Sequence, residues 1–219
     1  IMKKYLAVNK ETYDKIGEQY YQRLKNPSKD EYMPDDIVKF IFDEYNLHYH
    51  QNPHKVLELG PGSGGIINSF AKRGCVTCAI DISSNMINYA KKTSGDTIFI
   101  QEDILSCRSF FDKEFDVIYA GAFIHLFTLK DEAIILSKIK SWLTDKGVLF
   151  INTTLSDKSV EGYFIKDDYA GENKRYRRKW ERTELLVFLN GLGYNILKES
   201  IWNEMSRNKK WINIILNAK

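Results

Sequence analysis

A glycine-rich turn near residue 60 constrains the fold more than any other feature of the chain. Residues 56–65 read VLELGPGSGG, so a short apolar run enters the turn, and a helical pattern leaves it. Glycine tolerates positive backbone angles and lets a ligand approach the main chain closely. In an open parallel sheet, ligands bind beyond the carboxyl ends of the strands, near the point where the strand order reverses. The turn therefore predicts a site for a nucleotide-like cofactor.

Strand and helix patterns alternate around this turn and predict an α/β fold with a doubly wound, mainly parallel sheet. A helix and two strand-like runs follow near the C-terminus, and the short link between the two runs predicts an antiparallel hairpin. The expected strands are 56–60, 76–82, 97–103, 115–122, 148–153, 194–202 and 210–216, and the expected helices are 63–73, 84–93, 129–143 and 183–190.

Two further helices are expected before the turn. Tyr13, Ile16, Tyr20 and Leu24 recur at helical spacing, and Pro34 suits the first position of a second helix. We therefore interpret residues 1–219 as one domain with four parts. These are an N-terminal helical cap (1–54), a cofactor-binding core (55–153), a polar segment expected to be a substrate lid (154–181), and a C-terminal helix and hairpin (182–219).

The composition restricts the partners of this domain. The 219 residues carry a formal net charge of +3, which is too mild to indicate nucleic-acid binding. No apolar run has the length of a membrane span, so we expect a cytoplasmic protein without membrane contact. We expect it to be a monomer or a homodimer. Cys75 and Cys78 form a C-x-x-C that runs into the predicted strand 76–82, and both are expected to be buried. Because no further cysteine pair or nearby histidine completes a zinc set, no metal site is expected.

The neighbours of the turn decide which cofactor it suits. Gly60, Gly62 and Gly65 match the G-x-G-x-x-G pattern of dinucleotide sites. Gly60, Gly62 and Gly64 equally match the E/D-x-G-x-G-x-G pattern of S-adenosylmethionine sites. Glu58 would repel a pyrophosphate, but it can pair with a methionyl ammonium or orient it through water. It therefore favours S-adenosylmethionine.

Carboxylates also end the next two predicted strands. Asp81 can accept both ribose hydroxyls, a feature that the two cofactors share. Asp103 can accept the adenine amino group, although it could instead cap the segment that begins at Leu105. The apolar walls of an adenine pocket would come from Ile82, Met86 and Ile104.

The order of these motifs resembles the class I S-adenosylmethionine-dependent methyltransferases over residues 55–153. The matching segments are VLELGPGSGG, AIDISSNMINYAKK, QEDI, FDVIYAGAFIHLF and WLTDKGVLFIN. The resemblance implies a Rossmann-like sheet of seven strands, with the last strand inserted antiparallel, and S-adenosyl-L-methionine as cofactor. It implies cofactor contacts from Tyr20, Glu58, Gly60, Gly62, Gly64, Asp81, Ile82, Met86, Asp103, Ile104 and Ala120.

His125 is the candidate catalytic residue, because it follows the fourth predicted strand and histidine titrates near neutral pH. It could instead be hydrogen-bonded between a strand and a helix. Tyr13 and Tyr20 could contact the cofactor, or simply pack in the core, since both lie on one apolar stripe. Tyr21 lies off that stripe.

The strongest charge run is KRYRRKW at residues 174–180. It could bind RNA, bind an anionic small substrate, or be a solvated face. The segment DVIY at 116–119 lacks the Asn/Asp-Pro-Pro-Tyr/Phe signature of enzymes that methylate exocyclic base amines. We therefore expect methyl transfer to an oxygen or nitrogen of a small molecule. The alternatives are a peptide, protein or RNA acceptor, a non-catalytic cofactor-binding subunit, and a nicotinamide-dependent reductase.

Overall fold

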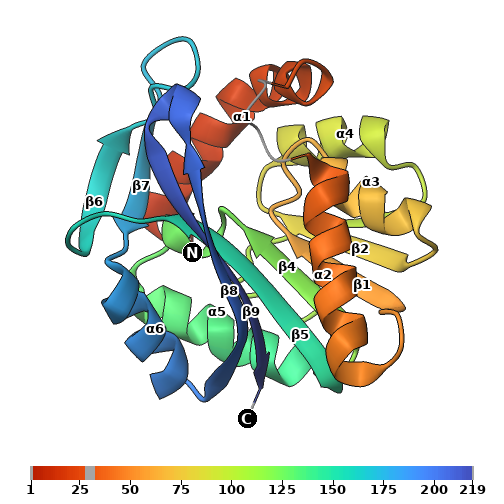
Figure 1. Cartoon of the computed structure of the whole chain (residues 1–219). Coiled ribbons are helices and arrows are strands. Elements are labelled where there is room, and N and C mark those ends of the chain that lie inside the picture. Colours follow the sequence, from red (N-terminus) through yellow and green to blue (C-terminus); the bar gives the residue numbers. More distant parts are fainter. Residues whose placement is uncertain (1, 28–32, 219) are drawn as a thin grey trace.

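A seven-stranded sheet with helices on both faces forms the body of the protein in the computed structural model, which describes residues 2–27 and 33–218 (Figure 1). The strand order is β3-β2-β1-β4-β5-β9-β8, so the order reverses between β1 and β4. The five strands β1 to β5 pair in parallel, and β9 pairs antiparallel with both β5 and β8. The strands are β1 (Lys55–Leu59), β2 (Val76–Asp81), β3 (Ile98–Gln101), β4 (Phe115–Gly121), β5 (Leu143–Thr154), β8 (Tyr194–Glu204) and β9 (Lys209–Ala218). The predicted α/β fold and its C-terminal hairpin are thus confirmed.

Two apolar cores separate the sheet from its helices. α2 (Pro34–Tyr49) and α3 (Gly65–Lys72) pack on one face, while α5 (Leu129–Trp142) and α6 (Arg182–Gly191) pack on the other. Helix α4 (Ser84–Thr93) lies beside β2 and β3. The central strands are buried on both faces, which explains why β1 reads as an apolar run without alternation.

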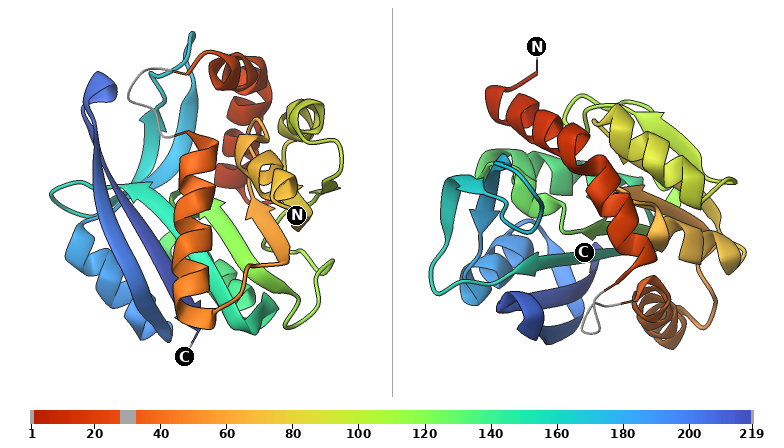
Figure 2. Two further views of the ribbon diagram at one scale, coloured as in Figure 1. Left: turned by 45° about the vertical axis from the view of Figure 1, so that its right-hand side comes forward. Right: turned by 90° about the horizontal axis from the view of Figure 1, so that it is seen from above.

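Helix α1 (Lys4–Lys25) crosses the molecule above the carboxyl ends of the parallel strands, as the view from above shows (Figure 2). It contacts α4 at one end of the sheet and the later strand β7 at the other. Both N-terminal helices are present as predicted, and Pro34 stands at the start of α2. α1 therefore covers the edge of the sheet at which the glycine turn opens.

The segment 154–181 contains regular structure that the sequence patterns did not predict. β6 (Val160–Ile165) and β7 (Lys174–Lys179) form a separate two-stranded antiparallel sheet. Asn9 fixes β7 to α1, because its side chain accepts from Tyr176 N (2.7 Å) and donates to Tyr176 O (3.1 Å). The expected lid is therefore a hairpin anchored to the N-terminal helix.

Several boundaries differ from the predicted ones. α3 begins at Gly65 rather than at residue 63, because Gly64 adopts a left-handed conformation (φ 83°) that ends the turn. β5 begins five residues earlier than expected, and β8 and β9 are both longer. Cys75 and Cys78 are buried, as predicted, and neither forms a disulfide. Within residues 2–27 and 33–218, no helix is long and apolar enough to cross a membrane, and no group of three or more potential metal ligands gathers.

Candidate functional site

Two adjoining cavities lie under α1 at the carboxyl ends of the strands. The first cavity is lined mainly by α1, the glycine turn and the ends of β2, β3 and β4. The second cavity, about 300 Å³, is lined by α1, the ends of β4 and β5, the β6–β7 hairpin and the β8–β9 hairpin. Tyr13, Tyr20, Gly121 and Ala122 line both cavities, so the two spaces meet at these residues.

The glycine turn brings bare backbone to the first cavity. Gly60 (φ 69°) and Gly62 (φ 54°) line it, and both have backbone angles that other residues rarely adopt. A Cβ at Gly60 would lie 2.7 Å from the ring of Phe123. Gly64 is placed differently, because a Cβ there would lie 2.8 Å from Ala90 O in α4. Gly64 thus serves the packing of α3 against α4, and it does not line the cavity.

Carboxylates and apolar side chains face each other across the first cavity. Asp81 lines it, and burial raises the pKa of this carboxyl to about 7. Asp81 Oδ1 accepts the N–H of Ser83 at 2.8 Å. Asp103 also lines the cavity, while its Oδ1 accepts the N–H of Leu105 at 3.0 Å, so the capping interpretation describes a real contact. The apolar lining includes the predicted Ile82, Met86 and Ile104.

Glu58 and Ala120 lie behind the cavity wall. The Glu58 side chain is only 3% exposed, and its Oε2 has no hydrogen-bond partner among the described residues. Burial, with the charge of Asp81 as a smaller cause, raises the pKa of Glu58 to about 8. Ala120 is buried in the core and lines neither cavity, whereas the next two residues, Gly121 and Ala122, line both.

His125 lines the second cavity from the 3-10 turn Ile124–Leu126. It is 2% exposed, and its Nδ1 lies 3.0 Å from Thr153 Oγ1 on β5. Burial and then the charges of Arg177 and Arg175 hold the pKa of His125 well below its usual range, so its imidazole is neutral at physiological pH. His125 is thus hydrogen-bonded between the 3-10 turn Ile124–Leu126 and β5, as one of the two interpretations expected. Its role as a catalytic base stays a prediction.

Tyr13 and Tyr20 are half-buried where the cavities meet, so neither is a plain core residue. Tyr13 Oη accepts a hydrogen bond from Arg175 Nη1 at 2.8 Å. The ring of Tyr20 stacks on that of Tyr169, with centroids 4.6 Å apart. Tyr21 lines neither cavity and contacts Tyr89.

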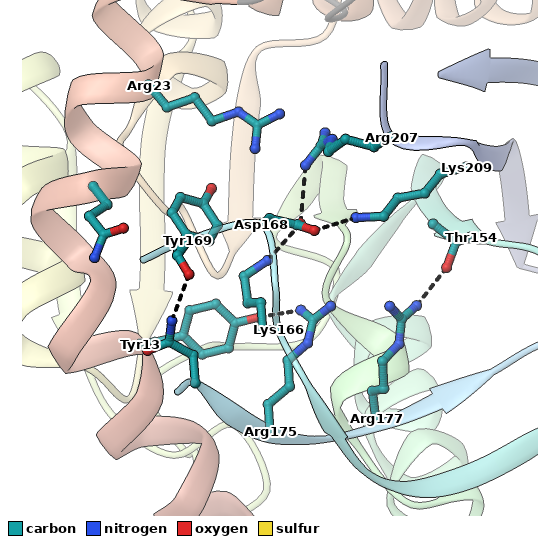
Figure 3. A network of polar contacts seen from close by, with 12 residues as sticks. Tyr13, Arg23, Thr154, Lys166, Asp168, Tyr169, Arg175, Arg177, Arg207 and Lys209 are labelled. Carbon is teal, nitrogen blue, oxygen red and sulfur yellow. Dashed lines mark hydrogen bonds and ion pairs between the residues drawn. The ribbon is translucent and has the colours of Figure 1, made fainter. Parts of the chain in front are cut away.

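The second cavity gathers cationic side chains from elements far apart in the sequence (Figure 3). Asp168 accepts from three of them, namely Lys166 (3.2 Å), Arg207 (3.1 Å) and Lys209 (2.7 Å). These contacts join the loop of the β6–β7 hairpin to the turn of the β8–β9 hairpin. Local sequence patterns do not reveal this network, because it depends on how closely the β6–β7 loop approaches residues 207–209.

Arg175 and Arg177 correct the interpretation of the basic run. Both guanidinium groups are buried and line the second cavity, so the interpretation as a solvated face is wrong for these two residues. They stand two residues apart on β7, and alternate residues of a strand point to the same face. The placement of two arginines at alternate positions of KRYRRK is the sequence signal that could have predicted a shared, inward-facing side for them.

Comparisons with known proteins agree with this geometry. Residues 57–151 match the model of a methyltransferase domain family. A crystal structure of the Burkholderia thailandensis 1,6-didemethyltoxoflavin-N1-methyltransferase, with 1,6-didemethyltoxoflavin and S-adenosylhomocysteine bound, has a similar fold. The TM-score is 0.75 at 15% identity, over 98% of this chain and 89% of that one. An S-adenosylmethionine-dependent methyltransferase from Clostridium acetobutylicum gives a TM-score of 0.68 at 14% identity, over 94% and 98% of the two chains.

Two curated relatives match at the level of sequence. The phosphoethanolamine N-methyltransferase of Plasmodium falciparum is 34% identical over 140 residues, which cover 61% of this chain and 48% of the relative. Polyamine aminopropyltransferase 1 of Aquifex aeolicus is 30% identical over 117 residues, covering 44% and 42%. The chain thus spans about half the length of the curated relatives it matches.

The sheet order, the glycine turn and the paired cavities define a Rossmann-like protein built to hold a nucleoside-type ligand at the switch point between β1 and β4. The family match and the structural likenesses narrow that class. Residues 57–151 match a methyltransferase domain family, and the whole chain shares the fold of S-adenosylmethionine-dependent methyltransferases of known structure.

Proposed function

We propose that the protein binds S-adenosyl-L-methionine in the first cavity and methylates an oxygen or nitrogen of a small molecule held in the second. The observation that carries this proposal is the meeting of the two cavities at Tyr13, Tyr20, Gly121 and Ala122. A methyl donor in one cavity and an acceptor in the other would come into contact only there.

The residues of the first cavity fit this cofactor. The positive φ of Gly60 and Gly62 leaves a backbone cradle that a Cβ would fill. Asp81 stands where a carboxylate can accept ribose hydroxyls, and Asp103 stands near apolar residues suited to an adenine ring. Glu58 lies behind the wall of this cavity, and its buried Oε2, without a partner among the residues described, can orient the methionyl ammonium through water.

When bound, S-adenosylmethionine supplies an electrophilic methyl group on a sulfonium. The chain contributes alignment and exclusion of water, the main requirements of an in-line displacement. Tyr13 and Tyr20 form the wall beside the transfer point, and α1 covers it. Burial and the nearby arginine charges keep the imidazole of His125 in its neutral form, so it can accept a hydrogen bond from a hydroxyl or amine acceptor and orient it for transfer.

The size of the second cavity supports a small acceptor over a peptide, protein or RNA. α1 and the two hairpins line it, and a cavity of about 300 Å³ suits a small molecule. Two of the similar proteins act on small molecules, 1,6-didemethyltoxoflavin in one case and phosphoethanolamine, by its name, in the other. The cationic walls speak against a polyamine acceptor of the kind that the Aquifex relative's name indicates, because like charges repel.

The test combines binding and transfer. Calorimetry with S-adenosylmethionine and with NADH should show binding of the first alone, and incubation of candidate small acceptors with methyl-labelled cofactor should yield labelled product. Binding of NADH instead would support the nicotinamide-dependent alternative. Tight cofactor binding without transfer to small molecules, but with transfer to peptide or RNA pools, would support the macromolecular alternative.

A further inference from the structure

Arg175 and Arg177 are buried cations that no carboxylate of the described residues neutralises by direct contact. Their side chains are 7% and 8% exposed. Arg175 donates to Tyr13 Oη (2.8 Å) and Arg177 donates to Thr154 Oγ1 (2.6 Å), and both acceptors are neutral. The Nε atoms of both have no hydrogen-bond partner within the described part of the chain. Figure 3 shows the two guanidinium groups rising from β7 into the same space below Asp168.

Two other cations on the same hairpins, Arg178 and Lys209, are neutralised by carboxylates. Arg178, the next residue on β7, forms an ion pair with Glu161 (3.1 Å) and lies over the ring of Trp180. Lys209 forms an ion pair with Asp168 (2.7 Å). Arg175 and Arg177 thus differ from Arg178 and Lys209, because their guanidinium groups face a cavity and pair with no carboxylate of the described residues.

Burying a charge without a counter-charge costs free energy, and the cost is removed when an anion binds. Burial, followed by the charge of Arg175, lowers the pKa of Arg177 to about 10. Lys166 adds a third buried cation close by, which lines the same cavity and shares Asp168 (3.2 Å) with Lys209 and Arg207; its Nζ lies 5.5 Å from the centroid of the Tyr20 ring. The site is therefore suited to an anion that a ligand brings.

We propose that Arg175 and Arg177, supported by Lys166, bind a phosphate monoester group of the methyl acceptor. This inference rests on the proposed function, because it assigns the substrate class of the same second cavity. A phosphate dianion offers three oxygens and two charges to two guanidinium forks and one ammonium. A carboxylate offers two oxygens and one charge, which would leave more of the buried positive charge uncompensated.

The contacts of Arg175 also limit the length of the acceptor. Arg175 is hydrogen-bonded to Tyr13, and Tyr13 lines the wall where the two cavities meet. An anion on Arg175 therefore lies about one side chain away from the point of transfer. We infer a short phosphorylated molecule whose accepting oxygen or nitrogen is a few bonds from the phosphate.

An anion could also come from the carboxylate of the cofactor, so the test separates the two sources. Calorimetry would titrate inorganic phosphate into the full chain saturated with S-adenosylhomocysteine, which already carries that carboxylate. Arg177→Gln and Arg175→Gln should each weaken phosphate binding by about 30-fold while changing the affinity for S-adenosylhomocysteine less than about threefold. Arg178→Gln is the matched control on the same strand, and it should leave phosphate binding within about twofold.

The inference is overturned if phosphate binds equally well to Arg177→Gln and wild type, or if the two arginine variants lose S-adenosylhomocysteine affinity as strongly as phosphate affinity. Thermal melting of each variant would show whether a loss of binding comes from unfolding. If Arg177→Gln unfolds, Arg177→Lys should be tested in its place. Lysine keeps the positive charge but lacks the two-pronged guanidinium group, so an intermediate phosphate affinity is expected.

A second readout uses transfer. Phosphoethanolamine and ethanolamine differ only in the phosphate, and we expect labelled product with the first and at least about tenfold less with the second. In Arg177→Gln, KM for the phosphorylated acceptor should rise more than kcat falls. The wild type could bind phosphate through Arg177 and yet transfer no methyl group to any acceptor. That outcome would contradict the proposed function but would still support the anion site. Methyl transfer at a rate indifferent to Arg177→Gln would contradict the anion site alone.

Discussion

The two cavities share a wall but differ in charge. Carboxylates characterise the first, where Asp81, Glu102 and Asp103 stand at or just beyond the ends of parallel strands. Arginines and lysines characterise the second, and most of them stand on the two antiparallel hairpins. The parallel half of the fold thus presents carboxylates that suit a ligand rich in hydrogen-bond donors. The antiparallel additions prepare a site for an anion.

The two sites also differ in how the chain builds them. Apart from α1 and the residues at and just after the end of β4, the first cavity comes from residues 60–104, a continuous stretch of strand-turn-helix units. The second draws on residues from α1 to β9, so it requires the whole chain to be folded. A substitution confined to one cavity should therefore spare the other.

The largest effect is expected from Gly62→Arg. Gly62 has φ 54° and lines the first cavity, and a Cβ added to it would lie 3.9 Å from the Tyr20 ring. An arginine would project into that cavity and adopt a strained angle, so S-adenosylhomocysteine affinity should fall more than about 100-fold by calorimetry. Gly95→Arg is the control, since a Cβ there meets no described atom within 4 Å. Equal losses in the two variants would refute the placement of the cofactor.

Asp81→Asn should have the next largest effect, at a pH of about 8.5, where the wild-type carboxyl is ionised. The amide keeps the shape but loses the charge that strengthens hydrogen bonds from ribose hydroxyls, so S-adenosylhomocysteine should bind about 30-fold more weakly. The affinity for inorganic phosphate should stay within about twofold. A comparable loss of both affinities would show that the two cavities are not separate sites.

The affinity for the cofactor should also depend on pH, and each of two buried carboxyls should contribute at least about tenfold between about pH 6 and about pH 8.5. Glu58 and Asp81 have raised pKa values of about 8 and about 7 in the cofactor-free chain. Hydrogen bonds from ribose and the methionyl ammonium favour their ionised forms, so binding releases protons and the affinity increases with pH. Calorimetry in two buffers of different ionisation enthalpy measures the release. Glu58→Gln should remove the contribution of Glu58 to the pH profile and leave that of Asp81, and an unchanged profile would exclude Glu58 as a source of the pH dependence.

The same carboxyls make a prediction about the stability of the cofactor-free chain. Their pKa values are raised on folding, so the stability that the protonated forms provide is complete below about pH 4 and is lost as the pH rises through about 7 and about 8. The melting temperature should therefore fall between about pH 5 and about pH 8.5, and Glu58→Gln should reduce that fall. S-adenosylhomocysteine should raise the melting temperature most at the alkaline end.

The smallest effect is expected from Tyr13→Phe, which removes the acceptor of the Arg175 hydrogen bond while keeping the ring. KM for a phosphorylated acceptor should rise about fivefold, in keeping with one lost hydrogen bond to a charged group. Tyr21→Phe is the control, because Tyr21 contacts Tyr89 and lines neither cavity. A change in S-adenosylhomocysteine affinity larger than the change in KM would place Tyr13 on the cofactor side of the shared wall.

The residues that line the first cavity lie in short local segments, and for that reason local patterns indicate them. The turn at Gly60 and Gly62 and the strand ends at Asp81 and Asp103 are each fixed by a few adjacent residues, and the parallel sheet then brings them to one edge. Gly64 and Ala120 show the limit of the pattern. Both belong to the motif segments, yet Gly64 packs against Ala90 and Ala120 lies in the core.

The sequence by itself determined the fold class, the position of the glycine turn and the carboxylates of the first cavity. Only the tertiary structure decided the second cavity, because β7 meets α1, and the loop around Asp168 meets Arg207 and Lys209, through contacts between residues far apart in the chain. A run of basic residues has the same composition whether water or a cavity surrounds it. Burial distinguishes the two cases, and burial is a property of the folded chain.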